Sequence, residues 1–573
     1  EEEAARKLAE ELGIHPILGR LLLNRCITTP AEAKKFFHPQ LSDLHDPFLM
    51  NDMREAVDAV NHAVGHNDRI LVFGDYDVDG CTAVTVVYKF LKAYCSNIDY
   101  YIPDRYDEGY GLSKRCIDYA FETGVKLMIV LDCGIKAIEE VAYANSRGIG
   151  VIICDHHVPD AELPDAVAIL NPKRKDSTYP YAHLCGCGVG FKLVQAYAQK
   201  NRMPFEQILP LLDLLVVSIA SDIVPLVGEN RILAYFGLKN LNREPSKGLL
   251  SIIKICGLDK HNITIDDIVF KIGPRINAAG RMRMDENDEN ASPSGGHAAV
   301  ELLIEGNESI AEEFGSVIDA YNQDRKSIDR SVTQEAHDYI EGNPEMKALK
   351  STVIYNPRWM KGIVGIVASR LIETYYRPTV VLTMSNGFVT GSARSVPGFD
   401  LYQAVESCSD LLENFGGHMY AAGLTMRPEN VGEFTRRFNA YVEENIDPQM
   451  LVPQVDIDSE LLFSDITPAF RKDLNRFQPF GPGNTAPVFA TCGVSNHGDA
   501  KLVGAECEHL RMDLTQRQKP NTTLQCIAFQ QPEHFEWIRS GRPVDVCYQI
   551  VENHYRGTVS TQLRIKDIKR VEK

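Results

Sequence analysis

Acidic residues and histidines follow three apolar runs in the first half of the chain. They are Asp75, Asp77 and Asp79 after ILVF, Asp132 after KLMIVL, and Asp155, His156 and His157 after IGVIIC. Carboxylates gathered in one cleft repel one another and raise each other's pKa, so a compensating charge is needed. Oxygen ligands combined with an imidazole favour Mn²⁺ or Mg²⁺ over zinc. Two such ions, about 3.5–4 Å apart, suit displacement at phosphorus. The pattern therefore predicts a two-metal phosphodiesterase site.

The elements that must position these residues alternate between short apolar runs and helical stretches from Arg69 onward. This alternation is typical of βαβ units and a parallel sheet. Ligands of open parallel sheets bind outside the carboxyl ends of the strands, where the acidic residues and histidines are expected. A fourth acid, Asp222, follows the helix-like stretch LLDLLVVSIAS and precedes Ile223-Val224-Pro225.

Each motif taken alone has a structural explanation. An isolated aspartate after a strand usually caps the next helix, which would account for Asp132 and Asp222. Asp155-His156-His157 is compatible with a turn, and the acids from Asp75 to Asp79 resemble a calcium loop. That loop lacks the bidentate glutamate it would need downstream. Ligand-type residues at three successive strand ends favour the metal site.

Composition limits the class of protein. A chain of 573 residues with 44% hydrophobic and 24% charged residues is expected to form several globular domains. The net charge of −18 argues against a nucleic-acid partner, but an acidic protein can still line one groove with basic residues. Fourteen scattered cysteines without a C-x-x-C pair indicate reduced thiols and no zinc site. Because no leader or apolar span is visible, we expect a soluble cytoplasmic protein without membrane contact.

The sequence also divides into segments of different character. Helical patterns fill residues 1–65, α/β alternation fills 66–300, and one long helix is expected over 301–342. A second, smaller α/β segment covers 343–450, and short β-like runs with turn residues cover 455–573, as in a small barrel. The acidic stretch from Asp285 to His297 is expected to be a surface loop.

A family resemblance rests on several motifs. GDYDVDG, LDCGI, CDHH and SDIVP resemble the motifs of the DHH phosphoesterases in order and spacing. The resemblance continues through KIGPRINAAGRM, KGIVGIVASRL, GSARS, GGHMYAAG and FQPFGPGNTAPVF. With these motifs included, the sequence resembles the RecJ family in particular. It implies a DHH catalytic domain at 66–300, a DHH-associated substrate-binding domain at 343–450 and an OB-fold nucleic-acid-binding domain at 455–573.

The resemblance also implies roles for individual residues. Asp75, Asp77 and Asp132 correspond to ligands of one metal ion. The ligands of the other ion correspond to Asp79, Asp132, His156 and Asp222, so that Asp132 bridges the two. Asp132, His156 and His157 are the implied catalytic residues, with His157 supporting a ligand or contacting phosphate.

Two further sets are expected to bind the substrate. Ser392, Arg394, Gly417 and His418 resemble the phosphate pocket of the DHH-associated domain; an arginine fork matches phosphate, and paired glycines admit backbone N–H groups. Arg105, Arg275, Asn277 and Arg281 are expected to hold the 5′ phosphate and the first nucleotides. Without the resemblance, GSARS would be interpreted as a β-turn, GGH as a helix-breaking loop and Arg105 as a solvated side chain.

The function implied by the resemblance is a 5′-to-3′ exonuclease specific for single-stranded DNA. It would release mononucleotides, use Mn²⁺ or Mg²⁺, and act as a monomer on free 5′ ends in repair and recombination. Single-strand-binding protein and a helicase are the expected partners. Two alternatives stay open: a short-oligonucleotide or cyclic-dinucleotide phosphodiesterase of the same superfamily, and a non-catalytic replication scaffold. The segment 455–573 separates the first alternative from an exonuclease, because such phosphodiesterases generally lack the barrel. The intact acidic residues and His156 speak against the second alternative.

Overall fold

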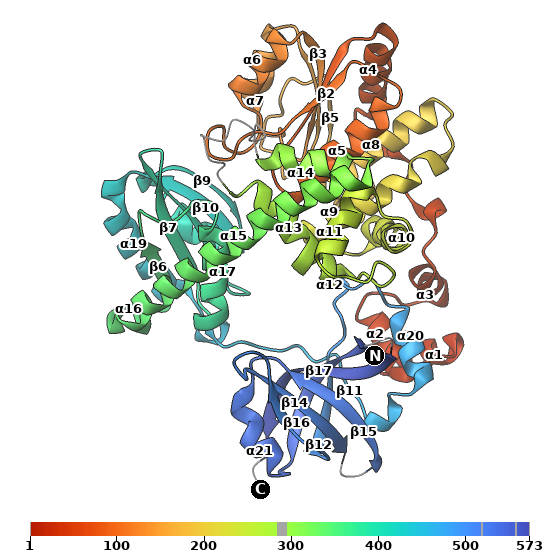
Figure 1. Ribbon diagram of the computed structural model, residues 1–573, viewed down its shortest axis with the longest axis vertical. Helices are drawn as coiled ribbons and strands as arrows, with labels where there is room; N and C mark the ends of the chain where they lie inside the picture. Colours follow the sequence, from red (N-terminus) through yellow and green to blue (C-terminus); the bar gives the residue numbers. More distant parts are fainter. Residues whose placement is uncertain (1, 283–294, 517–518, 556–557, 572–573) are drawn as a thin grey trace.

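The structure is a computed structural model that describes residues 2–282, 295–516, 519–555 and 558–571. Figure 1 shows three domains, each built around one sheet, with the long helix α15 running from the first domain to the second. Residues 285–294 of the acidic stretch expected to form a loop lie outside the described residues, and the prediction is wrong for residues 295–297, which begin helix α14.

The first domain contains the predicted parallel sheet, in the order β2-β1-β3-β4-β5. The strands are β1 (Arg69–Gly74), β2 (Ile98–Tyr101), β3 (Val125–Leu131), β4 (Gly150–Cys154) and β5 (Ala168–Leu170). Side chains alternate between its two faces. Ile70 and Val72 pack with α4 (Met53–His66), α5 (Val78–Lys92) and α8 (Gly186–Lys200), whereas Leu71 and Phe73 pack with α6 (Lys114–Glu122) and α7 (Ile138–Ser146).

The register of this sheet aligns three strand ends. Gly74 of β1 pairs with Leu131 of β3, and Leu131 pairs with Cys154 of β4. The residues that follow these three positions are Asp75, Asp132 and Asp155. The acids that the sequence places after separate apolar runs therefore start from neighbouring points on one edge of the sheet.

A helical layer completes the first domain and leads out of it. Its members are α9 (Leu212–Ser221), α10 (Gly228–Arg243), α11 (Lys247–Ile255), α12 (Ile265–Asp267), a π-helical turn over Ile268–Ile272, α13 (Gly273–Ala279) and α14 (Gly295–Ile304). The connecting helix α15 spans Glu308–Glu341, so the single helix predicted over 301–342 is wrong at its start: residues 301–304 belong to α14, and Asn307 caps the start of α15. Its 34 residues extend for roughly 50 Å at about 1.5 Å per residue.

The second domain has a mixed sheet in the order β6-β7-β8-β10-β9. The strands are β6 (Thr352–Tyr355), β7 (Thr379–Ser385), β8 (Phe388–Arg394), β9 (Leu412–His418) and β10 (Ala421–Met426). The second half of α15 and α17 (Val364–Tyr375) cover one face, while α18 (Leu401–Glu406) and α19 (Val431–Asn445) cover the other. The short helix α16 (Pro344–Ala348) follows α15.

The third domain is the predicted β-barrel. Its strands run in the order β11-β12-β16-β17-β15-β14-β13, and an additional β12–β14 pairing closes five of them into a barrel. The bounds are β11 (Ser459–Glu460), β12 (Phe489–Asn496), β13 (Lys501–Val503), β14 (His509–Gln516), β15 (Lys519–Ala528), β16 (Val544–Tyr555) and β17 (Thr558–Arg570), with helices α20 (Pro468–Asn475) and α21 (Phe535–Arg539).

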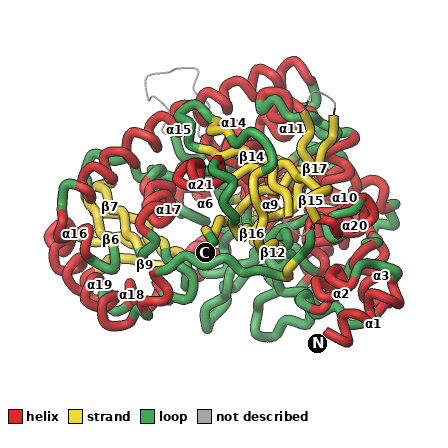
Figure 2. The backbone as a smooth tube through the Cα atoms, turned by 90° about the horizontal axis from the view of Figure 1, so that it is seen from below, coloured by secondary structure: helices red, strands yellow, loops and turns green. Residues whose placement is uncertain are grey.

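The helical segment expected at 1–65 is divided between two domains. Helices α1 (Glu2–Leu12), α2 (Pro16–Leu23) and α3 (Pro30–Phe37) share a core with the barrel, in which Leu22 and Phe37 pack with Phe477 and Phe489. Helix α4 belongs to the core of the parallel sheet instead. Figures 1 and 2 both place α1 and α2 beside α20. Among the described residues, no helix has the length and apolar character needed to span a membrane.

Candidate metal centre and phosphate pocket

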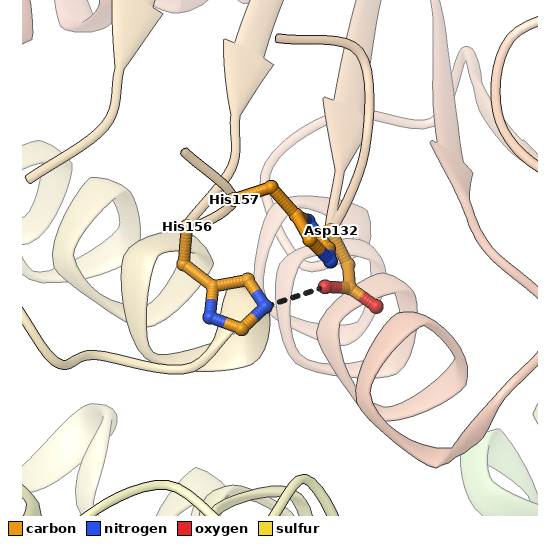
Figure 3. Close-up of side chains that lie close together, drawn as sticks. All are labelled: Asp132, His156 and His157. Atoms are coloured by element: carbon orange, nitrogen blue, oxygen red, sulfur yellow. Dashed lines mark ion pairs between the residues drawn. The ribbon is translucent and has the colours of Figure 1, made fainter. Parts of the chain in front are cut away.

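His156 lies at the centre of a carboxylate cluster. Its Nε2 atom is 3.2 Å from Asp132 Oδ1, 3.7 Å from Asp222 Oδ2 and 3.8 Å from Asp79 Oδ2. Figure 3 shows the His156 ring pointing at the Asp132 carboxylate, with His157 beside it. Two ligand groups have all their ligand atoms within 4.8 Å of one another: Asp132-His156-His157 and Asp79-His156-Asp222. Asp79 of α5, Asp132 after β3, the histidines after β4 and Asp222 at the end of α9 are thus brought together.

The donor atoms of the cluster fit divalent cations. Asp75 Oδ1, Asp132 Oδ1, Asp222 Oδ2 and both ring nitrogens of His156 are buried and have no hydrogen-bond partner among the described residues. Leaving such atoms unpaired is costly unless a ligand satisfies them. Burial, followed by neighbouring carboxylates, raises the pKa of Asp132 and Asp222, while burial lowers the pKa of His156. A neutral imidazole among carboxylates is a donor set for Mn²⁺ or Mg²⁺.

The carboxylate of Asp79 is held by three hydrogen bonds from distant segments. Gly186 N donates to Oδ2 at 2.6 Å, and Cys187 N and Ser218 Oγ donate to Oδ1 at 2.7 and 2.6 Å. The segment LCGCGVG opens helix α8, and the backbone N–H groups of Gly186 and Cys187 in its first turn point to Asp79. Asp77 is held locally, because its Oδ1 caps α5 by accepting from Gly80 N at 3.0 Å.

The helix-cap explanation of Asp132 and Asp222 is wrong. Helix α7 begins at Ile138 with Ala137 as its N-cap, and Asp222 is the C-cap of α9. Asp132 has φ 60°, a left-handed conformation that is unfavourable for a non-glycine residue and that clusters at functional sites. A Cβ at Gly186 would lie 2.6 Å from Asp132 Oδ1, so only glycine leaves room for this carboxylate.

Asp155 fixes the two histidines and was not given a role from the sequence. Its Oδ1 accepts from His156 N, His157 N and His157 Nδ1 at 2.7, 3.1 and 2.8 Å, and its Oδ2 accepts from Ile135 N. Burial lowers the pKa of His157, but the hydrogen bond and charge of Asp155 outweigh burial, so the net shift is upward. Tyr110, for which the sequence offered no signal, donates to Asp132 O at 3.0 Å.

The predicted cations divide into two groups. Arg105 stacks over the Tyr76 ring at 4.9 Å, and Arg281 donates to Gly362 O at 3.1 Å across the domain boundary. Burial, followed by the charge of Arg105, lowers the pKa of Arg281 to about 10, although the charge of Asp77 acts in the opposite direction. These two arginines lie beside the carboxylate cluster.

The other two predicted contacts are engaged within the protein. Arg275 donates to Asp319 Oδ1 and to Lys271 O, both at 2.8 Å, and so is bound to α15. Asn277 Oδ1 accepts a hydrogen bond from Val78 N at 3.2 Å, which connects α13 to the start of α5.

The residues predicted to bind the terminal phosphate lie on β8 and β9, the two strands that flank β10. Arg394 of β8 and His418 of β9 both pair with Ala421 of β10, and Ser392 Oγ accepts from the Arg394 guanidinium at 2.7 Å. Gly417 has φ 149°, and a Cβ there would lie 2.2 Å from Ala421 O. GSARS and GGH are therefore strand segments, and their interpretation as a turn and a helix-breaking loop is wrong.

Family models match three segments of the chain. The DHH family N-terminal domain matches residues 69–219, the DHHA1 domain 347–444 and the RecJ OB domain 457–567. The single-stranded-DNA-specific exonuclease RecJ of Bacillus subtilis strain 168 is 35% identical over 572 residues, 99% of this chain and 70% of the relative. The RecJ of Escherichia coli K12 is 31% identical over 576 residues, 96% of each chain.

Solved structures agree with the sequence relatives. The crystal structure of RecJ in complex with Mn²⁺ from Thermus thermophilus has a TM-score of 0.81 and 25% identity, covering 100% of this chain and 78% of that one. A crystal structure of exonuclease RecJ bound to manganese has a TM-score of 0.60 and 28% identity, covering 72% of this chain and 99% of that one. The chain therefore belongs to the RecJ family of single-stranded-DNA-specific exonucleases.

Proposed function

We propose that this protein is a single-stranded-DNA-specific exonuclease that uses two divalent cations and degrades from the 5′ end. The observation that carries the proposal is the cluster of buried, unpartnered ligand atoms at the ends of β1, β3 and β4. The relatives named as RecJ exonucleases, and the neighbours bound to manganese, support the same chemistry.

The ligand atoms divide into two sets that share one residue. Asp75, Asp77 and Asp132 would hold one ion. The second ion would be held by Asp79, Asp132, His156 and Asp222. Bound Mn²⁺ or Mg²⁺ supplies a nucleophilic water and stabilises the oxygens of the reacting phosphate. The hydrogen bonds of Gly186 and Ser218 keep Asp79 oriented, so little reorganisation is needed when the charge changes during the reaction.

His157 is suited to contact the substrate phosphate. Asp155 accepts a hydrogen bond from the Nδ1–H group of His157, which leaves Nε2 for a phosphate oxygen and favours the charged ring. Arg105 and Arg281 add positive charge beside the same cluster. Together these groups orient a phosphodiester and stabilise the negative charge that develops on it.

The pocket of Ser392, Arg394, Gly417 and His418 would receive the terminal 5′ phosphate. With one end fixed there, the next phosphodiester is presented to the carboxylate cluster, and each cycle releases one mononucleotide. The segment from Gly362 to Gly365 connects the two sites. The Gly362 carbonyl accepts a hydrogen bond from Arg281 beside the carboxylate cluster, and Gly365 lies next to Arg394 of the pocket.

The barrel supplies the preference for a single strand and separates the alternatives. OB barrels bind single strands through a basic groove and aromatic stacking. The match of residues 457–567 to the RecJ OB domain favours an exonuclease over a dinucleotide phosphodiesterase, and the intact ligand atoms disfavour a non-catalytic scaffold.

The cellular setting is proposed by analogy with the family. The enzyme would work as a cytoplasmic monomer in DNA repair and recombination, together with single-strand-binding protein and a helicase. Its DHH, DHH-associated and OB domains would span 66–300, 343–450 and 455–573, with 1–65 and 301–342 as helical and connecting segments.

Replacement of the shared ligand tests the proposed site. Asp132→Ala is expected to abolish hydrolysis in Mn²⁺ and in Mg²⁺ while single-stranded DNA still binds. The matched control is Asp118→Ala, which removes a partly exposed carboxylate of α6. Hydrolysis and binding would be measured on one labelled oligonucleotide. Wild-type activity of Asp132→Ala in Mn²⁺ would contradict the ligand assignment.

A further inference from the structure

Asp222 is held differently from the other ligand at its side, Asp79. The Asp79 carboxylate accepts three hydrogen bonds, whereas the buried Oδ2 atom of Asp222 has no hydrogen-bond partner among the described residues. Asp222 is the C-cap of α9, so it stands at the point where the helix ends and a loop begins. The position of its carboxylate therefore depends on the backbone of that loop.

The backbone directly after Asp222 is strained. Ile223 has φ 58°, a left-handed conformation that is a genuine outlier for a β-branched residue. Its side chain is 64% exposed, so packing of that side chain does not impose the conformation. Such a conformation is costly and persists only where the surrounding structure determines it. The contacts that determine it must lie elsewhere in the loop.

Three hydrogen bonds hold the next part of this loop. Pro225 O accepts from the Tyr181 hydroxyl at 3.2 Å and from Asn230 Nδ2 at 3.0 Å, both within the first domain. Leu226 N donates to Pro482 O at 2.6 Å. The third bond differs from the others, because its acceptor belongs to the segment that leads into the barrel.

That segment is shaped to receive the loop. A Cβ at Gly481 would lie 2.3 Å from Leu226 Cδ1 and 3.0 Å from Leu226 Cγ. Leu226 is 1% exposed, so its side chain has no room to move aside. Gly483 has φ 73°, and a Cβ there would lie 3.2 Å from Val227 Cγ1. Glycine at these two positions lets the segment approach the loop closely.

Residues 481–484 form a tight turn, here called the GPGN turn. Gly481 and Asn484 exchange two backbone hydrogen bonds of 3.0 Å. Asn484 is 1% exposed, and its Nδ2 donates to Phe477 O and Pro479 O at 2.8 Å each. Its Oδ1 accepts from Arg25 Nε at 2.7 Å. All the polar atoms of this side chain are thus engaged in holding the turn in one conformation.

The GPGN turn is joined directly to the barrel. Ala486 O accepts from Gln549 Nε2 of β16 at 3.0 Å, and β12 begins at Phe489. The turn lies within the motif FQPFGPGNTAPVF, which contributes no side chain to the metal centre or to the phosphate pocket. A continuous set of contacts therefore runs from the barrel through the turn and Leu226 to the loop that carries Asp222.

We infer that the GPGN turn positions Asp222 through Leu226, so that the placement of the barrel sets the affinity of the second ion site. The inference rests on the proposed function, which assigns Asp222 to the second ion. The turn is a positioning element, because it acts through the loop and not on the ion or the substrate. The second ion is then bound tightly only while the barrel is seated on the first domain.

Binding of Mn²⁺ to the metal-free full-length chain tests the inference. Titration followed by the EPR signal of free Mn²⁺ gives the number of sites and their Kd values, and Asp222→Ala identifies the step that belongs to the second ion. Gly481→Ala is expected to raise the Kd of that step about tenfold, the lower end of the range for groups that orient metal ligands, and to leave the other step unchanged. Leu226→Ala is expected to weaken the same step.

A double variant and a control variant separate positioning from general damage. In Gly481→Ala/Leu226→Ala the Leu226 atoms that the added Cβ would strike are absent, so the second ion should bind more tightly than in Gly481→Ala. The two single effects are then not additive, as expected for residues in contact. Gly432→Ala adds a Cβ in open space on α19 and should bind both ions as the wild type does.

The possible outcomes are distinct. A lower melting temperature with unchanged Mn²⁺ affinity would mark the contact as merely structural and would overturn the inference. An equal loss at both ion sites, or single effects that simply add in the double variant, would also overturn it. If Gly481→Ala does not fold, Leu226→Ala decides by the same criteria. If the wild-type chain binds fewer than two Mn²⁺ ions, the proposed two-metal function itself fails, whatever the variants do.

Discussion

Arg231 joins three parts of the chain, and its replacement is expected to loosen them. From α10, the buried guanidinium donates to five carbonyl oxygens, one in α3 and four in the segment that leads into the barrel. The acceptors are Phe36 O, Arg476 O, Phe477 O, Gln478 O and Pro479 O. The guanidinium also stacks on the Phe36 ring at 3.8 Å. Burial lowers the pKa of Arg231 to about 9, and no carboxylate is paired with it among the described residues.

The cost of Arg231→Ala follows from the acceptors that lose their donor. Asn484 Nδ2 also donates to Phe477 O and Pro479 O, so the carbonyls of Phe36, Arg476 and Gln478 are the ones left unpaired. Each of these partly buried acceptors costs about 1–3 kcal/mol when it loses its donor. Because the variant no longer has to bury a cation, it avoids a desolvation cost of several kcal/mol, which offsets part of this loss. We therefore expect a net loss of about 3 kcal/mol at this junction.

Hydrogen exchange at the junction measures this loss. Amides near residues 36–38 and 476–478 should exchange about 10²-fold faster in Arg231→Ala, because about 1.4 kcal/mol corresponds to a tenfold change in the opening equilibrium. Arg231→Lys should not rescue them, because an ammonium group cannot reach five carbonyls. Arg243→Ala, at the exposed end of the same helix, is the control. Exchange within threefold of wild type in Arg231→Ala would refute the assigned role.

Three further predictions concern the two sites. Gly186→Ala places a Cβ 2.6 Å from Asp132 Oδ1 and should lower kcat at least tenfold with little change in DNA binding. Steady-state hydrolysis measures kcat, and fluorescence anisotropy measures binding. An unchanged kcat would contradict the assigned position of Asp132. Asp155→Asn should lower kcat by about 10–100-fold, the range for groups that orient metal-site residues. The pH profile of hydrolysis should also shift, because His157 loses the charge that raises its pKa. An unshifted profile would argue against the role of Asp155 in holding His157. Arg394→Ala should remove the preference for 5′-phosphorylated over 5′-hydroxyl ends in a competition assay, and a retained preference would place the terminal phosphate elsewhere.

The sequence predicts well the strands and the positions of the acidic residues and histidines that follow them, because both are local properties. Apolar runs determine where β1, β3 and β4 lie, and the acids follow directly on them. The parallel arrangement then brings Asp75, Asp132 and the histidines to one edge. The phosphate pocket is predicted only through the family resemblance, since GSARS and GGH carry no local signal for strands.

Contacts between distant segments account for what the sequence could not show. Asp79 depends on Gly186 and Ser218, which lie more than a hundred residues away and have no periodic signal that links them to it. The association of α1, α2 and α3 with the barrel likewise depends on packing between chain segments far apart in sequence. Local patterns identify amphipathic helices, but the partner of each apolar face is set by tertiary packing.

Digestion of end-labelled oligonucleotides tests the central claim most directly. A 5′-phosphorylated single strand would be incubated with the protein in Mn²⁺, in Mg²⁺ or with chelator, alongside the matching duplex. The account predicts that a 5′ label appears at once as a mononucleotide, that a 3′ label passes through progressively shorter strands, and that chelator or duplex pairing stops both. Release of the 3′ label as the first mononucleotide, or full activity in chelator, would contradict it.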